Sequence, residues 1–190
     1  MKKRPRCEDD EESEPGEVFR IKNNVYFYAP VNTTSLVSFV KTLHSATTWA
    51  RKNGLRVFLY LHSEGGSVFD AFSMCDHIRQ NPVDVVTVAD GFVASAATFV
   101  LLCGAERWAL PETTLLIHEL RTNFWGQYAH LVDEMANSEQ LMERIKALYL
   151  AKSKLDAKRL DDLIKKELHL GAATALSYGL VDRIVGPEVR

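Results

Sequence analysis

Long apolar segments, metal-binding motifs and internal repeats are all missing from this 190-residue chain. The longest mainly apolar run, Phe92 to Cys103, is too short to cross a bilayer. The basic N-terminus is followed by acidic residues rather than by an apolar segment, so we expect no secretory signal. The apolar and charged fractions are those of an ordinary globular protein of one domain. We therefore predict a soluble, intracellular and cytoplasmic protein that does not contact a membrane.

Cysteine is also scarce. The three cysteines, Cys7, Cys75 and Cys103, are odd in number and lack the spacing of metal ligands. Two of them fall in predicted helices, where a reduced, buried thiol is the usual state of a cysteine. The pattern excludes a disulfide framework, and we expect neither a metal nor another cofactor.

The first 17 residues have almost no apolar character. They carry four basic and seven acidic side chains and end near Pro15-Gly16. Such a segment buries too little apolar surface to order itself, so we predict a disordered, solvated tail over 1–17 and one folded domain over 18–190. The short basic cluster at its start resembles a nuclear-import or nucleic-acid patch, but the acidic run beside it argues against phosphate binding. We expect no nucleic-acid partner.

The folded domain alternates strand and helix patterns. We predict strands within 18–28 and over 55–61, 83–88, 107–110, 115–120 and 180–185. We predict helices that begin at a Thr33 or Thr34 cap and end at Gly54, and that span 69–80, 96–103, 127–152, 156–168 and 172–178. The order and the short connections predict an α/β fold with a largely parallel sheet. The long helix over 127–152 should protrude from the domain, and its broad apolar stripe favours a partner.

Three features lie at predicted strand ends, where ligands gather in parallel sheets. Ser95 stands between a strand and a buried helix, Gly65-Gly66 follows another strand, and His118 ends a third. A serine with a base and nearby backbone N–H groups suits acyl transfer. The alternatives are a serine that only caps a helix and a histidine without a catalytic role.

Four segments in this order resemble the Clp protease proteolytic subunit (ClpP) family: L-Y-L-H-S-E-G-G-S-V, G-F-V-A-S-A-A-T-F-V-L-L-C-G-A, A-L-P-E-T-T-L-L-I-H-E-L and Y-G-L-V-D-R-I-V. The resemblance runs from about Val25 to Val185. It implies a crotonase-like spiral of β-α-β units with a protruding handle helix over about 127–152. It also implies a serine protease with Ser95 as nucleophile, His118 as base, and the N–H groups of Gly66 and Ala96 as oxyanion donors.

The resemblance places Glu167 where the family has an aspartate that orients the histidine. Glutamate is also a carboxylate but is one methylene longer, and Asp161 and Asp162 are nearby alternatives. The family's substrate groove falls on two segments of this chain, represented by Gly65, Ser67, Val68, Thr122, Asn123 and Phe124.

The family further implies a homo-oligomer of two stacked heptameric rings and a Clp-type AAA+ ATPase as candidate partner. The acidic tail stands in place of the family's apolar axial loop, which argues against that docking. The leading hypothesis is a serine endopeptidase that hydrolyses unfolded proteins or peptides inside a ring. The alternatives are a catalytically impaired ring subunit and a crotonase-type acyl-CoA enzyme, although no basic patch for a CoA phosphate stands out.

Overall fold

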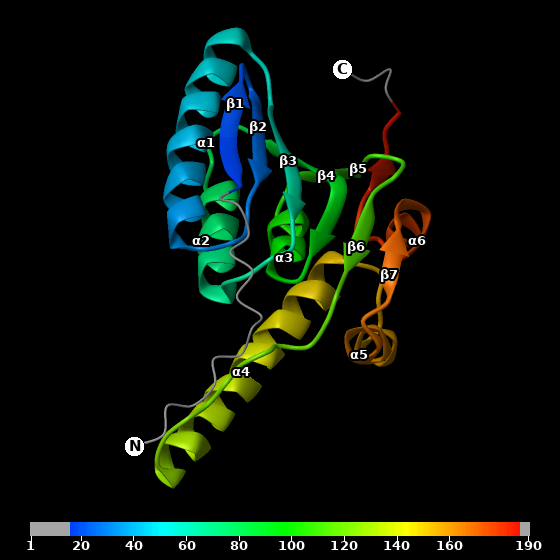
Figure 1. Ribbon diagram of the computed structural model, residues 1–190. Helices are drawn as coiled ribbons and strands as arrows, with labels where there is room; N and C mark the ends of the chain where they lie inside the picture. The colour runs from blue at the N-terminus through cyan, green and yellow to red at the C-terminus, as the bar shows by residue number, and fades with distance from the viewer. Residues whose placement is uncertain (1–15, 187–190) are drawn as a thin grey trace.

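The computed structural model describes residues 16–186, which form one mixed sheet with helices packed around it (Figure 1). The sheet follows the order β1-β2-β3-β4-β5-β8, and β6 joins β4 and carries β7. The strands are β1 (Glu17–Ile21), β2 (Asn24–Tyr28), β3 (Val57–Ser63), β4 (Val85–Ala94), β5 (Glu106–Ala109), β6 (Thr114–Leu116), β7 (His169–Gly171) and β8 (Arg183–Ile184). The helices are α1 (Thr33–Asn53), α2 (Val68–Arg79), α3 (Ala96–Leu102), α4 (Tyr128–Lys152), α5 (Ala157–Lys166) and α6 (Ala172–Ser177).

The predicted α/β class and largely parallel sheet are confirmed. The β2–β3, β3–β4, β4–β5, β4–β6 and β5–β8 pairs are parallel, whereas β1–β2 and β6–β7 are antiparallel. Since parallel strands end at one edge of the sheet, the turn after β3 and the turn after β4 meet there. These two turns contain the predicted glycine pair and Ser95.

Helix α1 shows how local sequence sets an element boundary. The side chain of Asn32, in extended conformation, accepts a hydrogen bond from the Ser35 N–H at 2.9 Å, and Ser35 Oγ accepts one from the Asn32 N–H at 3.0 Å. This reciprocal pair is a capping box, so the predicted cap at Thr33 or Thr34 is wrong by one or two residues. The predicted stop is confirmed, because Gly54 adopts the left-handed conformation with φ of 64°.

Helix α3 lies at the centre of the core. All seven of its residues are buried, and it follows β4 directly through Ser95. The strand is longer than predicted, because Phe92 to Ala94 pair with β6 after the N-terminal half of β4 has paired with β5. The predicted strand-to-helix junction at Ser95 is confirmed.

The predicted strand over 115–120 is wrong in its second half. Strand β6 ends at Leu116 because its partner β4 ends at Ala94, where the chain turns into α3. His118 therefore lies in a loop two residues beyond the strand. The sequence pattern also missed β7, which follows α5 and pairs antiparallel with β6. Helix α5 ends at Lys166 and not at the predicted residue 168, so Leu168 is outside the helix and 50% exposed.

The predicted tail over 1–17 overlaps the described chain at Gly16 and Glu17, and it is too long at its end, since Glu17 opens β1 and pairs with Tyr28. Residues 1–15, which hold the rest of that prediction, lie outside the described part of the chain.

Helix α4 extends away from the rest of the domain (Figure 1). Only Ile145 and Tyr149 are buried along it, whereas Tyr128, Val132 and Met135 are between 50% and 82% exposed. The apolar stripe predicted for this helix therefore packs against the core in its C-terminal half, from Leu141 onward. Among the helices within residues 16–186, none is both long and apolar enough to pass through a bilayer.

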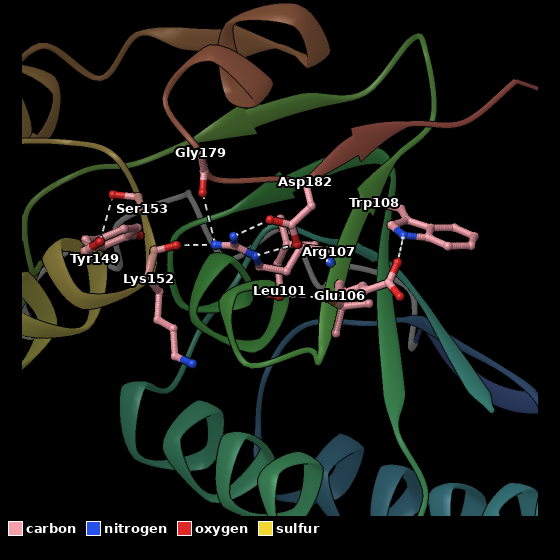
Figure 2. Close-up of polar contacts among 10 residues, drawn as sticks. Leu101, Glu106, Arg107, Trp108, Tyr149, Lys152, Ser153, Gly179 and Asp182 are labelled. Carbon is pink, nitrogen blue, oxygen red and sulfur yellow. Dashed lines mark hydrogen bonds and ion pairs between the residues drawn. The ribbon is translucent and has the colours of Figure 1, made fainter.

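An arginine anchors the C-terminal end of α4. Arg107 of β5 pairs with Asp182 through Nη2–Oδ1 at 2.5 Å and Nε–Oδ2 at 3.1 Å, and it donates to the carbonyl oxygens of Gly179 and Lys152 (Figure 2). Burial alone would raise the pKa of Asp182, but the hydrogen bonds from Arg107 outweigh it and lower that pKa. The cluster ties α4, the turn after α6 and the sheet together.

Candidate active site

Ser95 precedes α3 in a strained backbone conformation, and its side chain does not cap the helix. Its φ and ψ are 53° and −129°, a region that a non-glycine residue occupies at a cost of about 1–3 kcal/mol. Its hydroxyl makes no capping hydrogen bond to α3, and its N–H donates to the Leu116 carbonyl at 2.9 Å. The interpretation of Ser95 as a simple cap is therefore wrong, and the strained turn leaves its side chain partly exposed.

The Gly65-Gly66 turn packs directly on the Ser95 turn. A Cβ atom on Gly65 would lie 2.7 Å from the Ala94 carbonyl oxygen and 2.7 Å from Ser95 Cβ, and Gly65 has φ of 94°. Both the close approach and the positive φ require glycine at this position. The Gly65-Gly66 turn and the Ser95 turn, both predicted at strand ends, are therefore in direct contact in the folded chain.

The N–H groups of the two predicted oxyanion donors lie at these turns. Val31 bridges Gly66 in parallel fashion by donating to the Gly65 carbonyl at 2.7 Å and accepting from the Ser67 N–H at 2.8 Å. In such a bridge the central residue directs its own N–H away from the bridging strand, and Gly66 is one of the residues that line the pocket. Ala96 is the first residue of α3, where N–H groups have no partner within the helix.

His118 lies in the same pocket as Ser95. Its Nδ1 is 2.6 Å from the carbonyl oxygen of Glu119. Because a carbonyl oxygen only accepts, Nδ1 must carry the proton, which leaves Nε2 of the neutral ring with a free lone pair. This is the tautomer that a histidine base needs.

Glu167 contacts an arginine instead of the histidine. Nη2 of Arg121 lies 2.6 Å from Oε1 and 2.7 Å from Oε2 of Glu167. These hydrogen bonds lower the pKa of Glu167, and the nearby His118 lowers it further. Glu167 itself closes α5 in the left-handed conformation, with φ of 48°. Arg121 directly precedes the predicted groove residues Thr122 to Phe124, and its pairing with a residue 46 positions away left no signal in the sequence.

The two alternative acids have other neighbours. Asp161 forms an ion pair with Lys146 at 2.7 Å. Asp162 lies close enough to Arg159 to stabilise its positive charge. Neither carboxylate lines the pocket.

A pocket of about 390 Å³ surrounds Ser95 and His118. Seven of the predicted site residues line it, namely Gly66, Ser67, Val68, Ser95, His118, Thr122 and Phe124. Asn123 lines an adjacent hollow with Thr122 and Phe124. Gly65, Ala96 and Glu167 do not line it.

The apolar wall of the pocket was missed as a functional feature. It consists of Phe99 from α3 and of Leu141, Ile145 and Tyr149 from α4. The α4 residues are spaced four apart, so they lie on one face of the helix. The sequence carried this signal, but the same spacing is typical of any core-facing helix.

A chain of hydroxyl groups connects this wall to the Ser95 turn. Thr98 Oγ1 donates to the Ser95 carbonyl at 2.5 Å, so the Tyr149 hydroxyl must donate in turn to Thr98. Burial raises the pKa of Tyr149 well above its usual range, which keeps the phenol protonated as a donor. Helix α4 therefore helps to hold the strained turn.

Within residues 16–186 no cluster of three or more histidine, cysteine, aspartate or glutamate side chains is arranged to hold a metal ion. A second pocket, of about 410 Å³ and lined by Tyr26, Tyr28, Tyr60 and Trp108 among others, contains none of the predicted site residues.

The fold and the site together define an α/β protein in which a serine and a histidine share one pocket at the carboxyl edge of a parallel sheet. Residues 13–188 match the family model described as Clp protease, and the chain belongs to that family. It is 32% identical over 134 residues to an ATP-dependent Clp protease proteolytic subunit of Ostreococcus tauri, with 70% of this chain and 67% of the relative covered.

Two further relatives have the same kind of name. The ATP-dependent Clp protease proteolytic subunit of Nephroselmis olivacea is 28% identical, with 75% of this chain and 69% of the relative covered. The ATP-dependent Clp protease proteolytic subunit 1 of Streptomyces avermitilis is 34% identical, with 68% and 60% covered. The family predicted from the four segments is confirmed, and these names support a protease.

Proposed function

We propose that this chain is a serine endopeptidase that hydrolyses unfolded polypeptides or short peptides, with Ser95 as its nucleophile. One observation carries the proposal. The Ser95 hydroxyl is not used to cap α3, and it stands on a strained turn under Gly65-Gly66 in a pocket shared with His118. Strain of this kind persists where the surrounding structure enforces it, as nucleophiles at strand-to-helix turns require.

The reaction follows from these positions. His118 Nε2 accepts the hydroxyl proton while Ser95 Oγ bonds to the peptide carbonyl carbon, and the N–H groups of Gly66 and Ala96 donate to the oxyanion. The C–N bond then breaks, and His118 gives its proton to the departing amine. Water attacks the acyl-enzyme, its proton passes to His118, and Ser95 recovers its own proton as the acid product leaves.

Glu167 is the proposed orienting carboxylate, with the His118 imidazolium as its partner during turnover. Its support is that it lies near enough to His118 for the two charges to interact, whereas Asp161 is paired with Lys146. The Glu119 carbonyl holds His118 in the required tautomer at rest, but a full carboxylate charge stabilises an imidazolium better than a carbonyl dipole does.

The proposed assembly is a homo-oligomeric ring stack that uses α4. The exposed apolar residues Tyr128, Val132 and Met135 lie on a helix that projects from the domain, and such a surface favours burial against another chain. The groove segment Thr122 to Phe124 lies beside the pocket, where an extended peptide would add as a strand.

A fluorophosphonate probe tests the mechanism. We expect it to label Ser95 of the assembled protein, and labelling should disappear in Ser95→Ala and fall strongly in His118→Ala. Circular dichroism on each variant checks that the fold is intact. Labelling that survives Ser95→Ala would refute the assignment.

A second candidate is a ring subunit without turnover. The observation that favours it is the resting arrangement, in which Arg121 binds Glu167 and His118 faces Glu119. It predicts assembly without labelling or peptide hydrolysis. The crotonase-type acyl-CoA enzyme is less well supported, because the family match and the relatives' names are those of proteases.

A further inference from the structure

The contact between Arg121 and Glu167 bears on the proposed triad, and the inference below rests on the proposed function. A single nitrogen, Nη2 of Arg121, reaches both carboxylate oxygens, at 2.6 Å and 2.7 Å. Arg121 comes from the loop after His118, and Glu167 comes from the end of α5. These two loops, which in the proposed triad would bring His118 and Glu167 together, instead bring Glu167 against the Arg121 guanidinium.

This pairing opposes the work of an orienting acid. The guanidinium offsets the carboxylate charge that would stabilise the His118 imidazolium, and it adds a second positive charge near that ring. The other acidic side chains at the pocket are Glu119 and Glu134, both exposed, together with the buried phenol of Tyr149, which is bonded to Thr98, and neither glutamate is bound to His118 through its carboxylate. His118 Nδ1 meanwhile uses the Glu119 backbone carbonyl.

The geometry points to Arg121 as a positioning residue that holds Glu167 in a resting arrangement and must release it, with His118 Nδ1 moving from the Glu119 carbonyl to Glu167, for full activity. The Glu167 carboxylate thus has two alternative partners, Arg121 and His118, and we call the Arg121–Glu167 pair the latch. Only one of the two arrangements supports the imidazolium.

The latch is weak enough to open during turnover. The side chains of Arg121 and Glu167 are 70% and 45% exposed, so water screens the pair. Exposed ion pairs of this kind shift an equilibrium by about two- to fivefold. Removal of Arg121 should therefore raise the rate of the Ser95 reaction by about two- to fivefold, whereas a simple structural role predicts a decrease.

The test compares rates of fluorophosphonate labelling in the full-length, assembled protein. Arg121→Gln should be labelled faster than wild type. Arg121→Lys should stay close to wild type, because one amino nitrogen can replace the single nitrogen that makes both contacts. In a Glu167→Gln background, Arg121→Gln should not raise the labelling rate. The carboxylate for which Arg121 and His118 compete is then absent.

Arg56→Gln is the matched control. Arg56 pairs with Glu106 at 2.5 Å on exposed side chains and does not line the pocket, so its loss should leave the labelling rate unchanged. If Arg121→Gln is labelled at the wild-type rate or slower, or gains equally without the Glu167 carboxylate, the latch is refuted while the peptidase stands. Absence of labelling in every variant, Arg121→Gln included, refutes the peptidase and the latch together.

Discussion

Gly65→Ala should leave this protein folded but strongly slow the reaction of Ser95. The new Cβ would lie 2.7 Å from both the Ala94 carbonyl oxygen and Ser95 Cβ, and 2.9 Å from the Ala96 nitrogen. Ordinary contact starts at 3.4 Å, so the glycine turn and the Ser95 turn must move apart by roughly 0.7 Å. All three obstructing atoms belong to rigid parts of the chain, so no flexible side chain can absorb the shift.

Two effects follow from this change. Alanine at φ of 94° costs about 1–3 kcal/mol of stability. The displacement also moves Ser95 away from the Gly66 N–H, one of the two proposed oxyanion donors, and a misplacement near 1 Å at a reacting centre lowers rates by about 10²-fold. We expect a moderately destabilised protein whose fluorophosphonate labelling is about 10²-fold slower.

Gly54→Ala provides the control for strain alone. Gly54 has φ of 64°, yet a Cβ there would meet nothing within 4 Å. We expect a stability loss of about 1–2 kcal/mol with an unchanged labelling rate. Thermal unfolding and labelling measured on both variants give the comparison. A folded Gly65→Ala protein that is labelled at the wild-type rate would show that the two turns do not form the reacting site.

Two further predictions concern stability and assembly. The pKa of Asp182 is lowered in the folded state, so its stabilising effect is present above the unfolded value of roughly 3.9 and is lost as the pH falls through the lower folded value. Urea unfolding near pH 7 should therefore show Asp182→Asn to be less stable than wild type by about 1 kcal/mol, a value that allows for the partial exposure of Asp182. The difference in stability should shrink below pH 4. A difference that stays constant across pH would contradict the charge argument. Met135→Lys changes a residue that is 60% exposed on α4, so it should leave the melting temperature unaltered and weaken self-association in light scattering, and full assembly of this variant would remove α4 from the proposed interface.

Much of the fold was predictable because its determinants are local. Gly54 stops α1 through its own backbone conformation, and the β-branched run before Ser95 forms a strand whose end is followed at once by an apolar helix. The errors in the predicted strands occur where pairing with another strand decides whether a segment is a strand and where it ends. Strand β6 is short because β4 ends, and β7 exists only because β6 offers it a partner edge.

The candidate site, too, was predictable from the sequence only in part. Family resemblance and residue pattern were enough to select Ser95, His118 and the Gly65-Gly66 turn, and the pocket contains Ser95, His118 and Gly66. The apolar wall of Leu141 and Ile145 was visible as a stripe but had no assigned purpose, since spacing within a helix does not say which cavity the face will meet.

The amino-acid pattern alone was sufficient for the α/β class, the strand-to-helix junction at Ser95 and the long α4 helix, because each depends on neighbouring residues along the chain, and the resemblance of four segments was sufficient for the family. Contacts between distant segments needed the folded chain. Arg121 meets Glu167 across 46 positions and Arg107 meets Asp182 across 75, and no local preference encodes either pair. That Glu167 binds Arg121 is therefore a matter of tertiary packing, since the loop after β6 and the end of α5 bring the two side chains together.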